Sequence, residues 1–266
     1  MVTAAWQALF DEIAVWRDAG RTVDFWWRDD DAGRPAPALA RLIALAASAD
    51  VGLALAMIPD EAQREALADA PAWVGVIQHG VDHRNRAEPG GKKTEFPASE
   101  ETALALARLR AGHAALQRVA GERLLAVLVP PWNRISAPGL IAALADAGYR
   151  GLSRFDPRTS RIAAPGLLQV NTHVDIIDWR GSRGFAGEEL VLAQAIGHLR
   201  ARREGRADPD ECTGWLTHHA VHDEAAWAFM ALLLARTQGL QGVRWRGAAD
   251  VFAGPEDAAV KSLSSG

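Results

Sequence analysis

The sequence predicts an α/β protein built on a parallel sheet, in a single barrel-like domain. Short runs rich in β-forming residues alternate with longer Ala/Leu segments of helical period, which is the pattern of parallel α/β folds. At 266 residues, of which 49% are hydrophobic, the chain is long enough for one sizeable core. Neither a Ser/Gly linker nor a shift in composition divides it, so we expect one domain rather than two.

The individual elements follow from the same alternation. Leu39, Leu42, Ile43 and Ala46, for example, have the i, i+3, i+4, i+7 spacing of one buried helix face. A helix within 1–20 should pack on the domain of 21–255, 87–97 should form an irregular insertion, and the tail 256–266 should be disordered. The expected strands are at 22–27, 51–58, 72–78, 124–129, 149–153, 167–171, 214–217 and 242–245. The further expected helices are near 36–49, 61–70, 99–120, 136–148, 188–203 and 223–237.

Charge and composition exclude several classes of partner. The formal net charge is −4 and the 29 Lys and Arg residues are scattered, which argues against a nucleic-acid partner. The single cysteine, Cys212, cannot form an internal disulfide. Asp11 and Glu12 interrupt the first apolar segment where a signal peptide needs an unbroken one, and no run is long enough to span a membrane. We therefore expect a cytoplasmic protein without a membrane partner, whose oligomeric state is open.

Polar residues gather where the expected strands end. In α/β barrels the chemistry lies at the carboxyl ends of the strands and in the loops that follow them. Five strand ends should therefore place carboxylates, imidazoles and a Trp on one rim. The segments are RDDDAG (28–33), QHGVDHRN (78–85), PPWNR (130–134), HVDIIDW (173–179) and LTHHAVHD (216–223).

Two of these segments together suggest a metal site. His79 and His83 are four residues apart, a spacing that can place two imidazoles on one side of a helical turn. Such a pair is a weak signal by itself, but a carboxylate from the acidic triplet 29–31 would complete a three-ligand site with open positions. One Asp of the triplet could instead cap the helix that follows, yet three exceed what capping requires.

The ordered segments DDD, HGVDH, PPW, DIIDW and LTHH resemble the motifs of the polysaccharide deacetylases of carbohydrate esterase family 4, and they run from residue 28 to 219. The HxxxH and DxxDW segments are the most specific of the five. The resemblance implies a distorted (β/α) barrel of about seven strands, similar to a TIM barrel. It also implies a bound divalent metal ion, with Zn²⁺ favoured over Co²⁺, Mn²⁺ or Ni²⁺.

The resemblance also implies roles for individual residues. Asp29 corresponds to the catalytic base and Asp30 to a metal ligand, although the register can slip by one to Asp30 and Asp31. His79 and His83 correspond to the two metal-binding histidines, and His218 to the general acid, with His219 as its alternate. Asp175 corresponds to the residue that orients this acid. The substrate-binding positions are Pro131, Trp132, Asp178, Trp179 and Arg134.

The chain departs from the family pattern at one charged position. Val129 stands where the family has the arginine that braces its base, so Arg28 or Arg134 would have to substitute. The implied reaction is the hydrolysis of an N-acetyl or other N-acyl group from a sugar or oligosaccharide. A cytoplasmic location would favour soluble oligosaccharides, nucleotide-linked sugars or small amides. The alternatives are a hydrolase of small cyclic amides such as ureides, and a catalytically impaired metal- or carbohydrate-binding relative.

The remaining histidines receive other interpretations. His113 lies at helical spacing with leucines and should be a packed helix residue. His198 lies mid-helix beside basic residues and should be solvated. His222 precedes a helix for which Asp223 is the expected cap. His173 lies two residues before Asp175 and is left as a groove residue near the rim.

Overall fold

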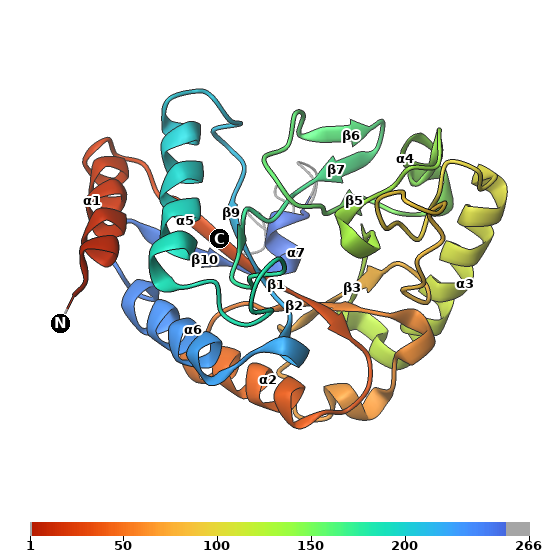
Figure 1. Cartoon of the computed structure of the whole chain (residues 1–266), viewed down its shortest axis with the longest axis horizontal. Helices are drawn as coiled ribbons and strands as arrows, with labels where there is room; N and C mark the ends of the chain where they lie inside the picture. Colours follow the sequence, from red (N-terminus) through yellow and green to blue (C-terminus); the bar gives the residue numbers. More distant parts are fainter. Residues whose placement is uncertain (1, 254–266) are drawn as a thin grey trace, which may run out of the picture.

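A computed structural model describes residues 2–253 as one curved, largely parallel sheet surrounded by helices (Figure 1). The strand order is β6-β7-β5-β4-β3-β2-β1-β9-β8, and β10 pairs with the first half of β1. All pairs except β6-β7 are parallel. The strands are β1 (Val23–Ala32), β2 (Ala54–Met57), β3 (Gly75–His79), β4 (Leu124–Val129), β5 (Gly151–Leu152), β6 (Ile162–Ala164), β7 (Leu167–Gln169), β8 (Val174–Asp175), β9 (Thr213–Thr217) and β10 (Val243–Arg246).

All helices except the last lie outside the curve of the sheet, as Figure 1 shows. Together with the sheet they bury the largest hydrophobic cluster, which includes Trp6, Trp16, Trp27 and Trp215. The last helix packs against the inner side, where its Ala248 joins the cluster around Trp26. No helix of the described residues is long and apolar enough to cross a membrane. The helices are α1 (Ala4–Asp18), α2 (Pro37–Ala49), α3 (Thr102–Ala120), α4 (Leu140–Ala143), α5 (Glu188–Arg203), α6 (Glu224–Thr237) and α7 (Ala248–Val251).

The inner, concave side of the sheet is filled by apolar side chains around Trp26. Trp26 of β1 packs there against Ala54, Ala56, Ile77 and Val129 from the neighbouring strands. These residues alternate with the outward-facing ones along each strand, as the pleat requires. The floor of the inner side is therefore apolar, and the polar residues lie above it at the carboxyl ends of the strands.

The predicted α/β class with a parallel sheet is confirmed, but the sheet is not closed into a barrel. The ladder ends at β6 on one side and at β8 on the other. The expected helix at 61–70 is wrong, since this region has only two 3-10 turns, Pro59–Glu61 and Arg64–Leu67. The expected helix at 136–148 contains a four-residue helix and a 3-10 turn. The predicted disordered tail, 256–266, lies outside the described residues.

Candidate functional site

The first strand extends through all three acidic residues and contains a bulge among them. Asp29 lies opposite Leu55 of β2, whereas Ala32 lies opposite Met57, so β1 has one residue more than β2 over this stretch. Asp31 has a φ of 67°, a left-handed conformation that Asp adopts more readily than most residues. Because a bulge interrupts the alternation of sides, Asp30 and Asp31 can both lie toward the inner face.

Asp29 lies on the other face of the strand and has its own partners. Its Oδ2 accepts hydrogen bonds from the Thr217 hydroxyl at 2.6 Å and from the His219 backbone N–H at 3.0 Å, and its Oδ1 lies 2.5 Å from His219 Nδ1. Burial raises the pKa of Asp29 and lowers that of His219, but their mutual attraction outweighs burial in both cases. The net result is a lowered pKa for Asp29 and a raised pKa for His219. The structure thus brings Asp29 and His219 together beneath the rim, and it does not bring Asp29 to the two predicted metal-binding histidines.

Asp30 is paired with Arg28, two residues earlier on the same face of β1. Arg28 Nε lies 2.8 Å from one carboxylate oxygen, and Nη2 donates to the other at 3.0 Å. Both side chains are almost fully buried, at 0% and 2% exposure. Arg28 also donates to Ser153, to the Arg154 carbonyl and to Asn133. A two-point ion pair with further hydrogen bonds fixes the direction of the Asp30 carboxylate.

Asp31 is the acidic residue that meets the two imidazoles. Its Oδ1 lies 3.1 Å from His79 Nε2 and 3.2 Å from His83 Nε2. His79 Nδ1 lies 3.1 Å from the Val129 carbonyl, which can act only as an acceptor, so Nδ1 carries a proton and Nε2, beside Asp31, is the nitrogen available to a metal ion. This arrangement of a backbone carbonyl behind an imidazole is typical of metal-binding histidines. The ligand atoms lie within 4.8 Å of one another, and this donor set suits a divalent metal ion.

The charges at this cluster are strongly coupled. Burial raises the pKa of Asp31, but His79, His218 and His83 more than offset it, and the net pKa is lowered. Burial lowers the pKa of His79, whereas Asp30 and Asp31 raise it by more. For His83, burial and then His79 lower the pKa, and the net shift is downward. A metal ligand set needs an ionised carboxylate and neutral imidazoles, so a bound metal ion would take the place of the proton that Asp30 and Asp31 favour on His79.

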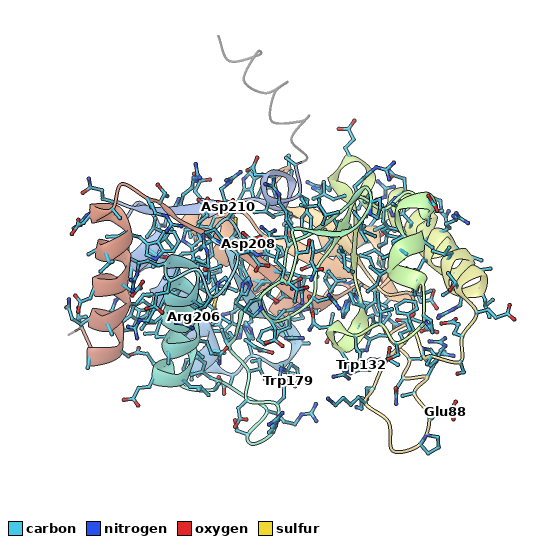
Figure 2. All side chains as sticks on the ribbon, turned by 90° about the horizontal axis from the view of Figure 1, so that it is seen from above. Glu88, Trp132, Trp179, Arg206, Asp208 and Asp210 are labelled. Carbon is cyan, nitrogen blue, oxygen red and sulfur yellow. The ribbon has the colours of Figure 1, made fainter. Side chains whose placement is uncertain are left out.

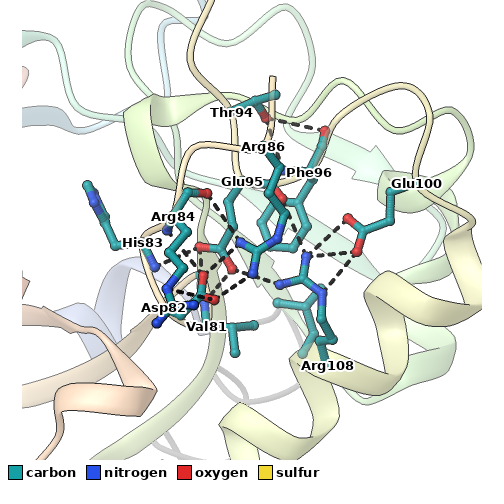
Figure 3. A network of polar contacts seen from close by, with 12 residues as sticks. Val81, Asp82, His83, Arg84, Arg86, Thr94, Glu95, Phe96, Glu100 and Arg108 are labelled. Atoms are coloured by element: carbon teal, nitrogen blue, oxygen red, sulfur yellow. Dashed lines mark hydrogen bonds and ion pairs between the residues drawn. The ribbon is translucent and has the colours of Figure 1, made fainter. Parts of the chain in front are cut away.

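His79 ends β3, and His83 lies in an irregular loop rather than on the expected helical turn. The loop is held by Glu95, whose carboxylate accepts the backbone N–H groups of Val81 and His83 and forms an ion pair with Arg108 (Figure 3). Glu95 is fully buried within the segment expected to be an irregular insertion. The sequence reasoning missed Glu95 because its contacts with the His83 loop are to backbone groups, which leave no residue pattern.

Gly80 makes this packing sterically tight and supports a prediction. Its φ is +56°, and a Cβ there would lie 2.2 Å from a Glu95 oxygen and 2.6 Å from Pro131. We expect Gly80→Ala to displace Glu95 and to weaken metal affinity roughly 10- to 100-fold, as lost support of a ligand commonly does. Competition with a coloured chelator would measure the affinity. Gly90→Ala is the matched control, since Gly90 has a φ of +79° but open space around it. Equal affinities of the two variants would contradict the role of Glu95.

His218 lies across the site from the metal-ligand cluster. Its Nε2 is 4.0 Å from Asp30 Oδ2, and its ring packs edge-on against Trp179 at 4.7 Å. The Trp179 indole N–H donates to Asp175 Oδ2 at 2.8 Å. Burial raises the pKa of Asp175, and the His218 charge only partly offsets this. Asp175 is thus linked to His218 by charge and by way of the ring of Trp179, which contacts both.

A groove of about 950 Å³ contains some of the predicted substrate-binding residues but not all of them. Trp132, Trp179 and Arg134 line the groove, together with Asp30, Asp31, His79, His83, Asp175 and His218. Pro131 is buried and is not part of the lining. Asp178 instead accepts the backbone N–H groups of residues 180, 181 and 182 and so shapes the loop that follows Trp179. Figure 2 shows Trp132 and Trp179 at the same edge of the molecule.

Of the two candidates for the missing family arginine, Arg28 lies beside Asp30 and Arg134 does not. Arg134 donates to the Lys93 carbonyl at 2.7 Å. Val129, at the family's arginine position, is buried and offers its carbonyl to His79. The sequence contained the relevant signal for Arg28, since residues two apart on a strand share a face.

The interpretations of His173 and His198 are wrong, because both side chains are buried. His198 belongs to the inner face of α5, seven residues after Val191, which is also buried. The two imidazoles stack 3.5 Å apart beside the buried Glu211. His173 Nδ1 accepts the Gly214 backbone N–H, so the neutral ring carries its proton on Nε2, the atom that faces Glu211. That tautomer is the wrong one for a metal ion at Nε2, and we interpret the cluster as a buried hydrogen-bonded group.

The stacked histidines predict a sensitivity to acid. Burial lowers the pKa of both rings, and neighbouring positive charges lower it further. For His173 these charges are Arg202, Arg158 and Arg28. For His198 they are His173, Arg202 and Arg158. Below pH 6.5 the unfolded chain binds protons that the folded chain does not, so the free energy of unfolding falls as pH falls. The protonation of Glu211, whose pKa burial raises to about 7, acts in the opposite direction and is common to wild type and variant.

We expect His198→Gln to reduce this acid dependence. Its free energy of unfolding should differ from that of the wild type by a constant above pH 7. Below pH 6.5 the wild type should lose about 1.4 kcal/mol more per pH unit than the variant, the amount for one proton. Urea denaturation at several pH values would measure both. Parallel curves down to pH 5 would show that His198 takes up a proton in the folded protein as easily as in the unfolded one.

Comparison with solved structures identifies proteins of the same fold. A protein from Mycobacterium smegmatis, named as a candidate polysaccharide deacetylase, superposes with a TM-score of 0.62 at 15% identity, covering 91% of this chain and 92% of that one. Puue allantoinase has a TM-score of 0.57 at 12% identity, covering 86% and 89%. A mutant of a CE4 family pseudoenzyme with restored enzymatic activity has a TM-score of 0.50 at 15% identity, covering 88% and 68%.

Comparison of sequences alone gives no match: neither a protein-family model nor a curated protein matches this chain. The structural likeness is therefore independent of close sequence similarity, and at 12–15% identity it concerns the fold. The order of the five motifs had predicted the same fold. The chain thus shares its fold with polysaccharide deacetylase structures over about nine tenths of its length.

Proposed function

We propose that this protein is a metal-dependent hydrolase that removes an N-acyl group, most simply an acetyl group, from a sugar or oligosaccharide. One observation carries the proposal: a carboxylate and two imidazoles converge at one end of the groove, with a second carboxylate and a third imidazole facing each other beside them. These are the groups that amide hydrolysis requires, namely a metal site, a base and an acid.

We assign the metal ligands to Asp31, His79 and His83, which is the shifted register of the two that the sequence allowed. A divalent ion, with Zn²⁺ favoured, lowers the pKa of a coordinated water to about 7 and polarises the acyl oxygen when bound. Asp30 is the base in this register. It lines the groove next to Asp31, but the Nε2 atoms of His79 and His83 contact Asp31 and not Asp30. The Arg28 ion pair holds the Asp30 carboxylate toward the position where the attacking water would lose its proton.

His218 is the general acid in this proposal. An amine is a poor leaving group unless it is protonated, and histidine is a common general acid in enzymes that work near neutral pH. Its Nε2 lies 4.0 Å from Asp30 Oδ2, and both side chains line the groove. A scissile bond in the groove could therefore receive a proton from His218 while its attacking water lost one to Asp30. Trp179 and Trp132 would wall the acyl group and the sugar ring.

His219, the alternate acid, is committed to Asp29 and lies on the outer side of β1. We propose that this pair positions the end of β9 against β1. The position of His218 then depends on it, because His218 is bonded in sequence to both Thr217 and His219. Asp29 and His219 would in this way support the reaction without touching the substrate.

A second function rests on the fold shared with an allantoinase. In that case the same residues would open a cyclic amide such as a ureide. The third alternative, a catalytically impaired relative, would keep the metal and bind carbohydrate without hydrolysis.

Metal content and product analysis on one preparation would separate the three. We expect about one equivalent of a divalent metal and acetate release from N-acetylated sugars, with loss of both in His79→Ala. Ring opening of ureides without acetate release would favour the second function. Stoichiometric metal without any hydrolysis would favour the third, and absence of both metal and hydrolysis would contradict the proposal.

A further inference from the structure

The mouth of the groove is lined by positive side chains from three separate segments. Lys92 and Lys93 come from the loop between β3 and α3, Arg134 follows β4, and Arg180 and Arg183 lie in the loop between β8 and α5. Within residues 2–253, none of these five forms an ion pair with a carboxylate in the structure, although most other arginines do. We call Lys92, Lys93, Arg134, Arg180 and Arg183 the cationic rim.

Both loops that carry the rim are held in defined positions. The Arg134 guanidinium donates to the Lys93 carbonyl, and the Thr94 hydroxyl donates to the Arg134 carbonyl at 3.1 Å, which ties the end of β4 to the first loop. In the second loop Asp178 accepts three successive backbone N–H groups. A Cβ on Gly181 would lie 2.2 Å from Asp178 Oδ2, so the turn is tightly wrapped around this carboxylate.

Aromatic faces accompany the charges on each side of the groove. Lys93 Nζ lies 5.9 Å from the ring centre of Trp132, and the Arg183 guanidinium lies 5.8 Å from that of Trp179. Figure 2 shows the two tryptophans at the edge from which both loops project. A ligand that stacks on either ring therefore lies within reach of a cation.

The carboxylates of the groove do not neutralise the rim. Asp30 is paired with Arg28, and Asp31 is shared by two imidazoles. Asp175 accepts the Trp179 indole N–H deeper in the groove. Among the described residues that line the groove, Asp156 is the remaining carboxylate, against five cations. A metal ion on the floor would add further positive charge.

A positive groove mouth in a protein of formal net charge −4 is a local feature that favours a negatively charged ligand. Neutral sugars would gain nothing from it, and a cationic polymer would be repelled. We propose that the substrate is an N-acylated sugar that carries an anionic group, phosphate or carboxylate, on or next to the acylated unit. The acyl group lies on the floor and the anion lies at the rim. This inference rests on the proposed function and specifies its substrate class.

Binding of matched sugars tests the proposal without requiring turnover. The probes are N-acetylglucosamine, its 1-phosphate and N-acetylmuramic acid, titrated calorimetrically into the full chain. We expect both charged sugars to bind roughly tenfold more tightly than the neutral one, with the advantage falling as salt is added. The relative affinities of phosphate and carboxylate then show which anion the rim prefers.

Four variants locate the effect. Lys92→Ser/Lys93→Ser and Arg180→Ser/Arg183→Ser should each remove most of the preference for charged sugars, with metal content unchanged. Arg118→Ser/Arg150→Ser is the control, because these two exposed arginines lie outside the groove. His79→Ala, which removes a proposed metal ligand, should retain the preference, and this separates the rim from direct binding of an anion to metal.

The outcomes distinguish this inference from the proposed function. If acetate is released from neutral and charged sugars with equal kcat/KM, the hydrolase proposal stands and the anionic substrate is excluded. If the charged sugars bind preferentially but no acetate is released, the rim is an anion site and the hydrolase proposal fails. Failure of all three sugars to bind, or undiminished preference in both rim variants, would overturn the inference.

Discussion

Asp31→Asn is expected to lose its metal, whereas Asp30→Asn is expected to keep it and to lose roughly 10²- to 10⁴-fold in kcat, the usual contribution of a positioned base. The reason is the bulge in β1, which places Asp31 against His79 and His83 and leaves Asp30 beside them with Arg28. Metal analysis of the purified variants and their rates of acetate release would measure both effects.

Asp29→Asn is the matched control for this pair of variants. It removes an adjacent carboxylate of the same triplet, but one that faces His219 on the other side of the strand. We expect it to keep its metal and to lose stability, since a buried ion pair would be broken. If Asp30→Asn lost its metal while Asp31→Asn retained it, the unshifted register would be correct and the position of the bulge would have no bearing on the ligand set.

Arg28→Met is expected to lower the free energy of unfolding by about 3–5 kcal/mol, the usual cost of leaving one member of a buried ion pair without its partner. Arg28 is completely buried, donates a hydrogen bond to Asp30 through Nη2 and has Nε 2.8 Å from the other Asp30 oxygen. It also donates to Asn133 and Ser153. Urea denaturation would measure the stability. The turnover rate should fall as well, because the carboxylate of the proposed base would no longer be held in one direction.

A double-mutant cycle with Asp30→Asn isolates the pair. The stability lost in Arg28→Met/Asp30→Asn should be several kcal/mol smaller than the sum of the two single losses, because residues in one ion pair are not additive. Additive losses would show that Arg28 acts through Ser153 and Asn133 instead. Arg134→Met provides the comparison for turnover, since Arg134 contacts the Lys93 carbonyl and not Asp30.

Periodicity predicted the long elements of the fold well, because each of them buries one regular face. The helix expected at 188–203 and the strand expected at 124–129 have those bounds in the structure. The segments at 61–70 and 136–148 also contain apolar residues at helical spacing, yet they form short 3-10 and α turns. Their conformation is set by contacts with neighbouring segments, which local spacing does not encode.

The sequence predicted which strand ends would meet, but not the direction of each side chain there. The five polar segments indicated a common rim, and the groove lined by residues from all five follows from parallel pairing of the strands. The register of the triplet could not be decided, because a bulge depends on how β1 pairs with β2. The same limit applies to Glu95, whose contacts with the His83 loop are to backbone groups, and to His173 and His198, which are buried by a neighbouring element.

Because of the bulge, the number of residues in the acidic triplet decides which of its carboxylates reach the groove. In a regular strand three consecutive carboxylates would point out, in and out, and a single one would reach the groove. The extra residue in β1 changes this parity, so that Asp30 and Asp31 can share the inner side. Deleting one aspartate would leave two adjacent carboxylates, as many as the groove uses, but the restored pleat would turn them to opposite sides. The number of residues in this segment therefore matters to the site as much as their acidity.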